Sequence, residues 1–369
     1  MRVLYIINNL NKGGAERLMV DMLPLFRNSG LEVELLQLSN KQSETEYINI
    51  LLKENIVCTH LNFSSIYNPF IIFKLLAYVK SSRYDIIHVH LFPSMYWAAM
   101  ASKLVKNKAH LVFTEHSTQN KRFDKKYLQF FEQWIYNSYD KIVVISEAIR
   151  LKLNTWTGLP MKIELIRNGV NINHFSEVQH YDNEYWLNNF SIPSNAVKLM
   201  MTARFSYPKD HKTLIKALSL LPPNYYLILT GDGLNRGAVE QYSKELGISS
   251  KVHFLGFRTD VASLMKSVDI NILSSEYEGM SGVTLEALAA GKPFLGSDVS
   301  GINDVVPDSR FLFKPANSND LARSIQEIIL NHDLNKSMIR DALKYAEKFN
   351  VHFTIECYKD LYDKTLNEK

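Results

Sequence analysis

Residues 269–293 read DINILSSEYEGMSGVTLEALAAGKP, and this stretch decides the fold. An apolar strand at 269–273 runs into a glycine-rich loop, and the loop opens a short helix. A helix N-terminus carries unpaired backbone N–H groups and partial positive charge, so it attracts phosphate. Glu278 and Glu286 lie eight positions apart on either side of it, where carboxylates can accept hydrogen bonds from sugar or ribose hydroxyls. The stretch predicts a strand–loop–helix unit that binds a nucleotide-sugar.

Strand-like runs alternate with helical patterns through nearly all 369 residues, which predicts parallel sheets flanked by helices. In the first half, strands are expected at 3–8, 33–38, 86–91, 111–114, 142–145 and 163–166. In the second half, they are expected at 198–203, 226–230, 252–255, 270–273, 293–296 and 310–313. Helical patterns fall between the strands of the first half, for example at 16–26 and 125–138, and in the second half helices are expected at 211–221, 236–246, 261–266, 283–290, 319–332, 335–349 and 352–366.

A polar stretch separates the two halves, and we interpret residues 173–195 as a linker. The predicted fold is α/β, with two Rossmann-like, doubly wound domains at residues 1–172 and 196–351. Because ligands gather beyond the carboxyl ends of the strands in such domains, we expect the active site in a cleft between them.

The composition is that of an ordinary globular protein with two cysteines, Cys58 and Cys357, which favours a reducing compartment over a disulfide framework. The first ten residues lack the pattern of a signal peptide, and the apolar run at 70–79 is too short to span a bilayer. Residues 1–172 carry 21 Lys and Arg against 14 Asp and Glu, a net charge of +7, whereas residues 173–369 carry 21 against 24, a net charge of −3. The basic half predicts an anionic partner or, alternatively, an ordinary solvated surface.

The first strand is followed by Gly13 and Gly14, which open a helix. Glycines at this point permit close approach of a phosphate or sugar to the helix N-terminus, although a plain tight turn is the alternative. The spacing is not G-x-G-x-x-G, so a dinucleotide-dependent dehydrogenase is disfavoured.

Histidines end two of the predicted strands: His88 and His90 end one, and His116 follows the next. His116 could hydrogen-bond a sugar or steady charge near a reacting carbon, and a buried structural role is the alternative for both His90 and His116. Together with His110 these residues could suggest a metal site, but no metal-binding spacing supports one, and we expect neither a metal nor another cofactor.

In the second half, Arg204 follows a strand and Lys209 lies on the next loop. Two cations at a strand end could bind a diphosphate and let it depart from a sugar without a metal ion, although a solubilising surface pair is the alternative. Gly231 ends the following strand, and Phe257 and Arg258 end the one after it, where backbone groups could meet a nucleobase.

The order of these motifs resembles the retaining glycosyltransferases of family 4, which have the GT-B fold. The matching pieces span nearly the whole chain: Gly13–Glu16, Thr114–His116, Asn168–Asn171 with Phe175, Arg204 with Lys209, Gly231–Gly233, Phe254–Gly256, and Glu278 to Ala287. Departures from the common pattern are Met280 and Ser281 in place of Phe-Gly, Asn171 in place of Asp, and Asp304 in place of Glu, and they bear on donor identity.

The resemblance implies site residues for a sugar transfer that needs no metal. Arg204 and Lys209 would bind the donor pyrophosphate, Glu278 the donor-sugar hydroxyls, and Glu286 the ribose. Other implied donor-site residues are His116, Gly14, Ser281, Gly282, Val283 and Thr284. The last helix, 352–369, would pack back on the N-terminal domain.

The predicted activity is transfer of a sugar, with retention, from a nucleotide donor to a hydroxyl of a lipid-linked or glycan acceptor. UDP is the favoured donor nucleotide, and assembly of bacterial surface polysaccharide or lipid-linked oligosaccharide is the favoured setting. The alternatives are a GT-B epimerase, a phosphorylase, or a non-catalytic nucleotide-sugar binding protein. No nucleic-acid partner is expected.

We expect a cytoplasmic protein, with peripheral attachment to the inner face of the membrane as a further hypothesis. Aromatic Trp97 and Trp134 lie near its candidate basic residues, which are Lys103, Lys106, Lys108, Lys121, Arg122, Lys125 and Lys126.

Overall fold

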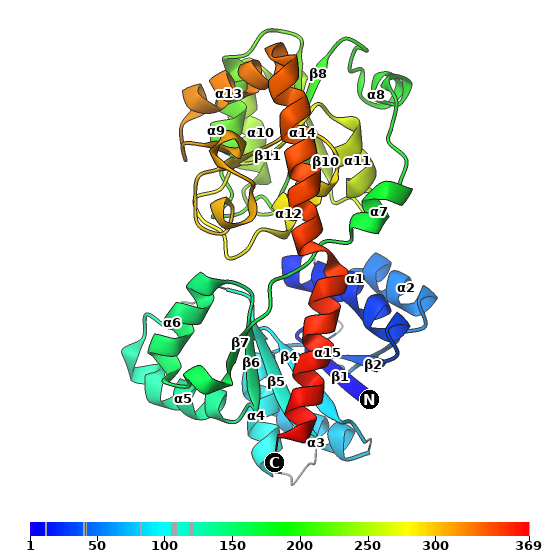
Figure 1. Cartoon of the computed structure of the whole chain (residues 1–369), viewed down its shortest axis with the longest axis vertical. Coiled ribbons are helices and arrows are strands. Elements are labelled where there is room, and N and C mark those ends of the chain that lie inside the picture. Colours follow the sequence, from blue (N-terminus) through cyan, green and yellow to red (C-terminus); the bar gives the residue numbers. More distant parts are fainter. Residues whose placement is uncertain are drawn as a thin grey trace. The chain divides into compact units, whose positions relative to one another are not determined.

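The computed structural model describes residues 1–11, 13–39, 41, 43–81, 83–104, 109–117 and 122–368. The chain divides into two compact units, one formed by residues 1–168 with 351–369 and the other by residues 169–350. Each unit is a parallel sheet covered by helices (Figure 1). The prediction of an α/β fold with two Rossmann-like, doubly wound domains is therefore confirmed.

The first unit is built on a sheet whose described residues form seven parallel strands in the order β3-β2-β1-β4-β5-β6-β7. The strands are β1 (Arg2–Ile7), β2 (Glu32–Gln37), β3 (Val57–His60), β4 (Ile86–His90), β5 (His110–Glu115), β6 (Lys141–Val144) and β7 (Ile163–Leu165). The helices are α1 (Gly14–Asn28), α2 (Thr45–Lys53), α3 (Ile71–Ser81), α4 (Ser94–Leu104), α5 (Gln129–Asn137), α6 (Glu147–Thr157) and α15 (Val351–Asn367), with 3₁₀ turns η1 (Lys126–Leu128) and η2 (Pro160–Lys162). The order of connection reverses between β1 and β4.

The second unit is built on a sheet whose described residues form six parallel strands in the order β10-β9-β8-β11-β12-β13. The strands are β8 (Val197–Thr202), β9 (Tyr225–Thr230), β10 (Val252–Gly256), β11 (Ile270–Leu273), β12 (Phe294–Ser297) and β13 (Leu312–Phe313). The helices are α7 (Ile172–Glu177), α8 (Asn183–Phe190), α9 (His211–Ser219), α10 (Arg236–Glu245), α11 (Val261–Ser267), α12 (Gly282–Ala289), α13 (Ser318–Leu330) and α14 (His332–Ala346), with 3₁₀ turns η3 (Ser249–Lys251), η4 (Asn303–Val305), η5 (Ser309–Phe311) and η6 (Glu347–Phe349). Here the order of connection reverses between β8 and β11.

The central strands form because their apolar runs are covered by helices on both faces of the sheet. All five side chains from Val3 to Ile7 of β1 are buried, and all four of β11 are buried as well. Each sheet core is therefore rigid up to the carboxyl ends of its strands, where the loops begin.

The last helix, α15, belongs to the first unit, and Figure 1 shows it in red beside α1 and the strands of that unit. Its Tyr362 hydroxyl is 3.0 Å from the Tyr5 hydroxyl of β1 and 2.6 Å from Nδ1 of His88 on β4. Thr354 donates to the carbonyl of Arg167 at 3.0 Å. Buried hydrogen bonds as well as apolar packing hold α15 on this sheet.

Residues 173–195 are not the linker that their polarity predicted. They form α7 and α8 and lie in the second unit. Trp186 of α8 is only 1% exposed, and the ammonium of Lys266 on α11 donates to the carbonyls of Phe175 and Val178 at 2.6 and 2.8 Å. Buried aromatic side chains and these hydrogen bonds attach the stretch to the second sheet, and the division between units falls at residues 168 and 169 instead.

Candidate functional site

In the second unit, the candidate site lies where the strand order reverses. β8 and β11 are neighbours, but the chain leaves them in opposite directions, toward β9 on one side and β12 on the other. The loops that follow them therefore diverge and leave room for a ligand beyond the strand ends. These loops, residues 203–210 and 274–281, carry Arg204, Lys209 and Glu278.

The two loops are tied together through their backbones. Lys209 and Ser275 form an isolated antiparallel bridge. On either side of it, the amide of Asp210 donates to the Ser274 carbonyl at 3.0 Å, and the amide of Glu276 donates to the Pro208 carbonyl at 2.9 Å. Because the two loops are paired through their backbones, the side chains of Lys209 and Glu278 are held in a fixed position relative to each other.

Lys209 and Glu278, predicted to serve the same ligand, are in direct contact. The Lys209 ammonium donates to Oε1 of Glu278, and the Ser275 hydroxyl donates to the same oxygen at 2.6 Å. The two ionic side chains are only 17% and 14% exposed. Neither Oε2 of Glu278 nor the other two ammonium protons of Lys209 have a partner among the described residues, so both groups can still bind a ligand. Ser275 was missed by the sequence analysis because nothing in the local pattern distinguishes this serine from Ser274.

The loop that follows β12 also holds the backbone at Glu278. The Glu278 amide donates to the Ser300 carbonyl at 3.2 Å, and the Ser281 amide donates to the Gly301 carbonyl at 3.0 Å. Gly301 has φ +81°, and a Cβ at this position would lie 2.5 Å from the Glu278 carbonyl oxygen. Asp304 closes the turn by accepting from the Gly301 amide at 3.0 Å. Glycine at position 301 therefore allows the backbone of this loop to pack closely against the backbone of Glu278 and hold it in place.

Arg204 lies at the end of β8 with its side chain exposed. Its guanidinium has no hydrogen-bond or ion-pair partner among the described residues, so it can bind an anion without first breaking a contact. The backbone around it is well held, because the Ala203 amide donates to the Thr230 carbonyl and the Phe205 amide to the Asp232 carbonyl, each at 3.0 Å. An unpaired cation on a rigid backbone is suited to binding a phosphate.

Gly231 supports the backbone beneath Arg204, and its predicted contact with the donor stays a prediction. It has φ +120°, and a Cβ there would lie 2.1 Å from the Ala203 carbonyl oxygen. The loop after β9 can therefore pack against the loop after β8 only if position 231 carries no side chain.

The N-terminus of α12 carries residues 281–284, for which contact with the donor stays a prediction. The Ser281 side chain caps the helix by accepting from the Thr284 amide at 3.2 Å, and the Thr284 hydroxyl donates back to it at 2.9 Å. The amides of Gly282 and Val283 have no partner among the described residues. Gly282 is exposed, with no atom within 4 Å of a Cβ built on it. Glu286 follows on the same helix and is half-buried.

Arg258 is bound within the second unit. Its guanidinium donates to both carboxylate oxygens of Asp260, at 2.7 and 2.5 Å, and to the Tyr185 hydroxyl at 3.3 Å. Tyr185 in turn stacks on Tyr181 with ring centroids 3.8 Å apart. Arg258 thus fastens α8 to the loop after β10, and contact of a nucleobase with the backbone at Phe257 and Arg258 stays a prediction.

In the first unit, the strand order reverses between β1 and β4, and Asn8 joins the two strand ends. Its side-chain amide donates to the Phe92 carbonyl at 2.8 Å, and its carbonyl accepts from the amide and hydroxyl of Ser94.

At the start of α1, the Glu16 carboxylate folds over Gly13, since a Cβ at position 13 would lie 2.0 Å from its Oε2. A Cβ on Gly14 would have no atom within 4 Å, so packing does not require glycine at position 14.

The histidines at the ends of β4 and β5 form one cluster, from which His110 is separated because it begins β5 at the other end of the sheet. His90 Nδ1 lies 3.0 Å from His116 Nε2, and the His88 ring lies 4.3 Å from that of His90. Burial lowers the pKa of His116 to about 4 and that of His88 to about 3, where the nearby His116 adds to the effect. Among the described residues, no group of three or more His, Cys, Asp or Glu side chains is placed to hold a metal ion.

Arg122, expected on a basic membrane-binding surface, is buried instead. Its guanidinium pairs with Glu132 at 2.8 Å and with Glu115 at 3.4 Å, and it lies over the Phe92 ring at 4.7 Å. Two buried carboxylates attract this arginine inward, because an unpaired buried charge would be costly. Arg122 therefore links Glu115 at the end of β5 to Glu132 on α5.

The remaining basic candidates divide into two groups. Lys103, Lys125 and Lys126 are exposed, whereas Lys106, Lys108 and Lys121 lie outside the described residues. Of the two tryptophans, Trp134 on α5 is 45% exposed. Trp97 is half-buried and donates to the Ile66 carbonyl at 2.7 Å.

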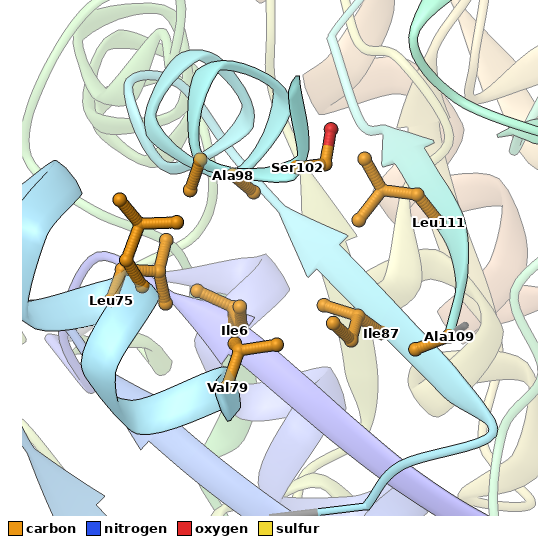
Figure 2. Close-up of a pocket in the computed structure, with 10 residues that line it drawn as sticks. Ile6, Leu75, Val79, Ile87, Ala98, Ser102, Ala109 and Leu111 are labelled. Carbon is orange, nitrogen blue, oxygen red and sulfur yellow. The ribbon is translucent and has the colours of Figure 1, made fainter. Parts of the chain in front are cut away.

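A cavity of about 50 Å³ lies inside the first unit, between α3, α4 and the sheet (Figure 2). Its walls are apolar, with Leu75 and Val79 from α3 facing Ile6 and Ile87 from the sheet. The hydroxyl of Ser102 in this wall already donates to a backbone carbonyl. The described residues that line the cavity offer no free polar side chain to orient a sugar or nucleotide, so we regard it as a packing void.

Two family models match the chain and together cover most of it. The model described as Glycosyltransferase Family 4 matches residues 12–174, and the model described as Glycosyl transferases group 1 matches residues 182–345. The chain is a group 1 glycosyltransferase. The stretch between the two matches, residues 175–181, runs from the second half of α7 to just before α8, close to the division between the units.

This glycosyltransferase is similar in sequence to enzymes of known activity. A Campylobacter jejuni enzyme, N-acetylgalactosamine-N,N'-diacetylbacillosaminyl-diphospho-undecaprenol 4-alpha-N-acetylgalactosaminyltransferase, is 24% identical over 93% of this chain and 94% of its own length. An Escherichia coli enzyme, UDP-Gal:alpha-D-GlcNAc-diphosphoundecaprenol alpha-1,3-galactosyltransferase, is 22% identical over 95% and 93%.

Solved structures support the same fold. HepE of Anabaena, crystallised with UDP and glucose, superimposes with a TM-score of 0.86 at 21% identity, over 98% of this chain and 99% of its own. The GT-B architecture of the glycosyltransferase is therefore shown. Of the helices formed by its described residues, none combines enough length with enough apolar side chains to span a bilayer.

Proposed function

We propose that this glycosyltransferase moves a sugar from a UDP-sugar to a hydroxyl of a lipid-linked acceptor, with retention at the anomeric carbon. The setting we infer is assembly of surface polysaccharide or lipid-linked oligosaccharide at the cytoplasmic face of the membrane. The observation that carries the proposal is the cluster at the β8/β11 reversal, where Arg204, the Lys209–Glu278 pair and the open N-terminus of α12 come from adjoining loops.

The proposed donor site assigns a role to each of these groups. The Arg204 guanidinium and the Lys209 ammonium bind the diphosphate, and the free amides of Gly282 and Val283 add hydrogen bonds at the helix N-terminus. Glu278 accepts from hydroxyls of the donor sugar through its free Oε2, and Glu286 accepts from the ribose. Because an ammonium has three donors, Lys209 can keep its contact with Glu278 and still bind a phosphate oxygen.

The chemistry follows from this distribution of charge. The acceptor oxygen bonds to the anomeric carbon as the bond from that carbon to the phosphate oxygen breaks, and the departing diphosphate takes the acceptor proton. Arg204 and Lys209 stabilise the negative charge that develops on the leaving group, so the proposal requires no metal ion. Transfer should therefore persist in the presence of EDTA.

The choice of UDP and of a lipid-linked acceptor rests on similarity. HepE was crystallised with UDP-glucose as well as with UDP and glucose. The names of the Campylobacter and Escherichia coli enzymes specify diphosphoundecaprenol acceptors and alpha linkages. Retention predicts that the product has the same anomeric configuration as the donor sugar. NMR coupling constants of the product measure that configuration.

Glu278→Ala separates recognition of the sugar from recognition of the nucleotide. In the wild type, we expect UDP but not GDP to raise the melting temperature, since a ligand at a hundred times its Kd stabilises by about 2.7 kcal/mol. The cognate UDP-sugar, found from a panel, should raise it further. Glu278→Ala should keep the response to UDP and lose the additional response to the sugar, because Oε2 no longer binds its hydroxyls. Thermal shift measures both responses.

Glu276→Ala is the matched control, since Glu276 is an exposed carboxylate two residues away and should leave both responses unchanged. Equal loss of the UDP response in Glu278→Ala would overturn the assignment of Glu278 to the sugar. A larger response to GDP would overturn the choice of UDP. Consumption of the donor without an acceptor would favour the epimerase.

The first unit also carries a surface suited to an anionic membrane, and we include this contact in the proposal. The α5 face, as we name it, consists of Lys125, Lys126, Tyr127, Phe130, Phe131 and Trp134. Tyr127 is 77% exposed and Phe130 is 85% exposed. Phe131 and Trp134 stack with ring centroids 6.0 Å apart, and both lysines are exposed. Aromatic side chains beside lysines fit the interfacial region of a bilayer that contains acidic lipids.

Lys125→Glu with Lys126→Glu should weaken binding to vesicles of phosphatidylglycerol and phosphatidylcholine. Each basic residue near an anionic surface contributes about 1 kcal/mol, so loss of two should lower affinity by roughly 30-fold at low salt, and repulsion from the two added carboxylates should lower it further. Phe130→Ser with Trp134→Ser should weaken binding at every salt concentration. Vesicle sedimentation measures both effects, with Leu330→Ser as the control for loss of an exposed apolar side chain, here 82% exposed in the second unit. Equal binding to pure phosphatidylcholine would contradict the proposal.

A further inference from the structure

His90 is a buried residue to which the proposed reaction assigns no role. It is 1% exposed, and Nδ1 makes its one hydrogen bond, to Nε2 of His116 at 3.0 Å. Its Nε2 is buried and has no partner among the described residues. Its neighbour His88 differs, because both ring nitrogens are used: Nδ1 with the Tyr362 hydroxyl at 2.6 Å and Nε2 with the Thr114 hydroxyl at 2.7 Å.

A hydrogen bond between His90 Nδ1 and His116 Nε2 requires a proton on one of these two nitrogens and a lone pair on the other. Two arrangements of the ring protons satisfy this requirement. In the first, His90 donates from Nδ1, its buried Nε2 is a lone pair, and the proton of His116 is on Nδ1. In the second, His116 donates from Nε2, and the proton of neutral His90 must be on its buried Nε2. Buried N–H groups without an acceptor are rarer in proteins than buried acceptors without a donor, which favours the first arrangement.

Both rings are neutral near pH 7, as either arrangement requires. Burial lowers the pKa of His116 to about 4. Burial lowers the pKa of His90 well below its ordinary range, and the adjacent His88 and His116 lower it further. A neutral ring has one nitrogen that donates and one that accepts. Because the two rings are hydrogen-bonded, the nitrogen that carries the proton on one ring determines which nitrogen carries it on the other.

We propose that His90 is a positioning residue that sets the tautomer of His116, so that His116 presents Nδ1–H as a fixed hydrogen-bond donor. Nε2 of His116 is occupied by His90, which leaves Nδ1 as the nitrogen that can meet a ligand. Nδ1 has no partner among the described residues, and His116 follows the carboxyl end of β5, where ligands of such sheets bind. The ligand class is a neutral oxygen acceptor, such as a sugar hydroxyl, and this part rests on the proposed function.

The protonation itself can be tested without any substrate. Long-range ¹⁵N–¹H correlation spectra of the ligand-free protein, labelled with ¹⁵N-histidine, distinguish protonated from unprotonated ring nitrogens. Signals are assigned by their loss in His116→Gln and His90→Asn. We expect a protonated Nδ1 and an unprotonated Nε2 for both His90 and His116. A protonated Nε2 on His116 overturns the proposal.

The consequence for activity is tested by two substitutions at the same position. His90→Leu removes the donor to His116 and should lower kcat/KM about tenfold, the effect of losing one hydrogen bond. His90→Asn retains an N–H donor near the position of Nδ1 and should recover most of that loss. Equal activity of the two variants overturns the proposal, and the spectra decide the tautomer even if His90→Leu does not fold.

Tyr362→Phe serves as the control for disturbance of the buried cluster, because it removes a partner of His88 but none of His90. It should leave the ¹⁵N shifts of His116 unchanged, and movement of those shifts would count against a role specific to His90. Failure of the proposed function would appear separately, as absence of transfer by the wild type from every UDP-sugar tested, with the spectra unaffected.

Discussion

Arg204→Ala is expected to lower kcat by about 10²–10³, the usual effect of losing one preorganised donor that stabilises a developing negative charge. The reason is that the Arg204 guanidinium has no partner among the described residues and is therefore free to bind the departing diphosphate at the end of β8. The loss should fall on kcat more than on KM, because the charge grows as the bond to the sugar breaks. Steady-state kinetics with the cognate UDP-sugar measure it.

The fold should survive this substitution, since the Arg204 side chain is exposed and has no hydrogen-bond or ion-pair partner among the described residues. The melting temperature of Arg204→Ala should match that of the wild type. Arg340→Ala is the matched control, as Arg340 has a 74% exposed side chain in the same unit and, of the residues that the structure describes, pairs only with Asp341. Near-normal turnover by Arg204→Ala would contradict the assignment of this arginine to the leaving group.

Gly231→Ala is expected to destabilise the second unit by about 3 kcal/mol or more. A residue with a side chain is strained at φ +120°, and its Cβ would lie 2.1 Å from the Ala203 carbonyl oxygen, which is backbone and cannot rotate away. For a unit of this size, the loss corresponds to a fall in melting temperature of roughly 6–12 °C. Thermal unfolding followed by circular dichroism measures it.

The matched control for this effect is Gly237→Ala in the same unit. Gly237 lies in α10, has no atom within 4 Å of its Cβ position and has no positive φ, so alanine should be neutral or stabilising there by up to about 1 kcal/mol. Equal melting temperatures for the two variants would contradict the steric role of Gly231. Because Gly231 supports the Arg204 backbone, we also expect the activity of Gly231→Ala to fall below the wild-type value.

The sequence alone predicted most of the secondary structure, because the central strands are uninterrupted apolar runs. It did not reveal β3, residues 57–60, which lies at the edge of its sheet and has a 56% exposed Val57 in place of a continuous apolar run. Residues 173–195 were misread for the opposite reason. Their polar side chains outnumber the few aromatic ones, such as Trp186, that hold the stretch on the second unit.

The sequence also allowed residues that follow different strands to be assigned to the same site. The carboxyl ends of parallel strands meet at one edge of a sheet, and so Lys209 and Glu278 could be assigned to one site although 69 positions separate them. The direct contact between them, and the part played by Ser275, could not be predicted, because they depend on how two loops pair through their backbones.

The pattern of residues along the chain determined the fold class, the strand ends and the residue types that gather there, because periodicity and turn chemistry are local properties. Tertiary structure alone decided which charges are free. Within the described part of the chain Arg204 has no partner, whereas Arg258 is held by Asp260 and Arg122 is buried between two glutamates. The availability of an arginine depends on the nearest carboxylate in space, and the fold determines which carboxylate that is.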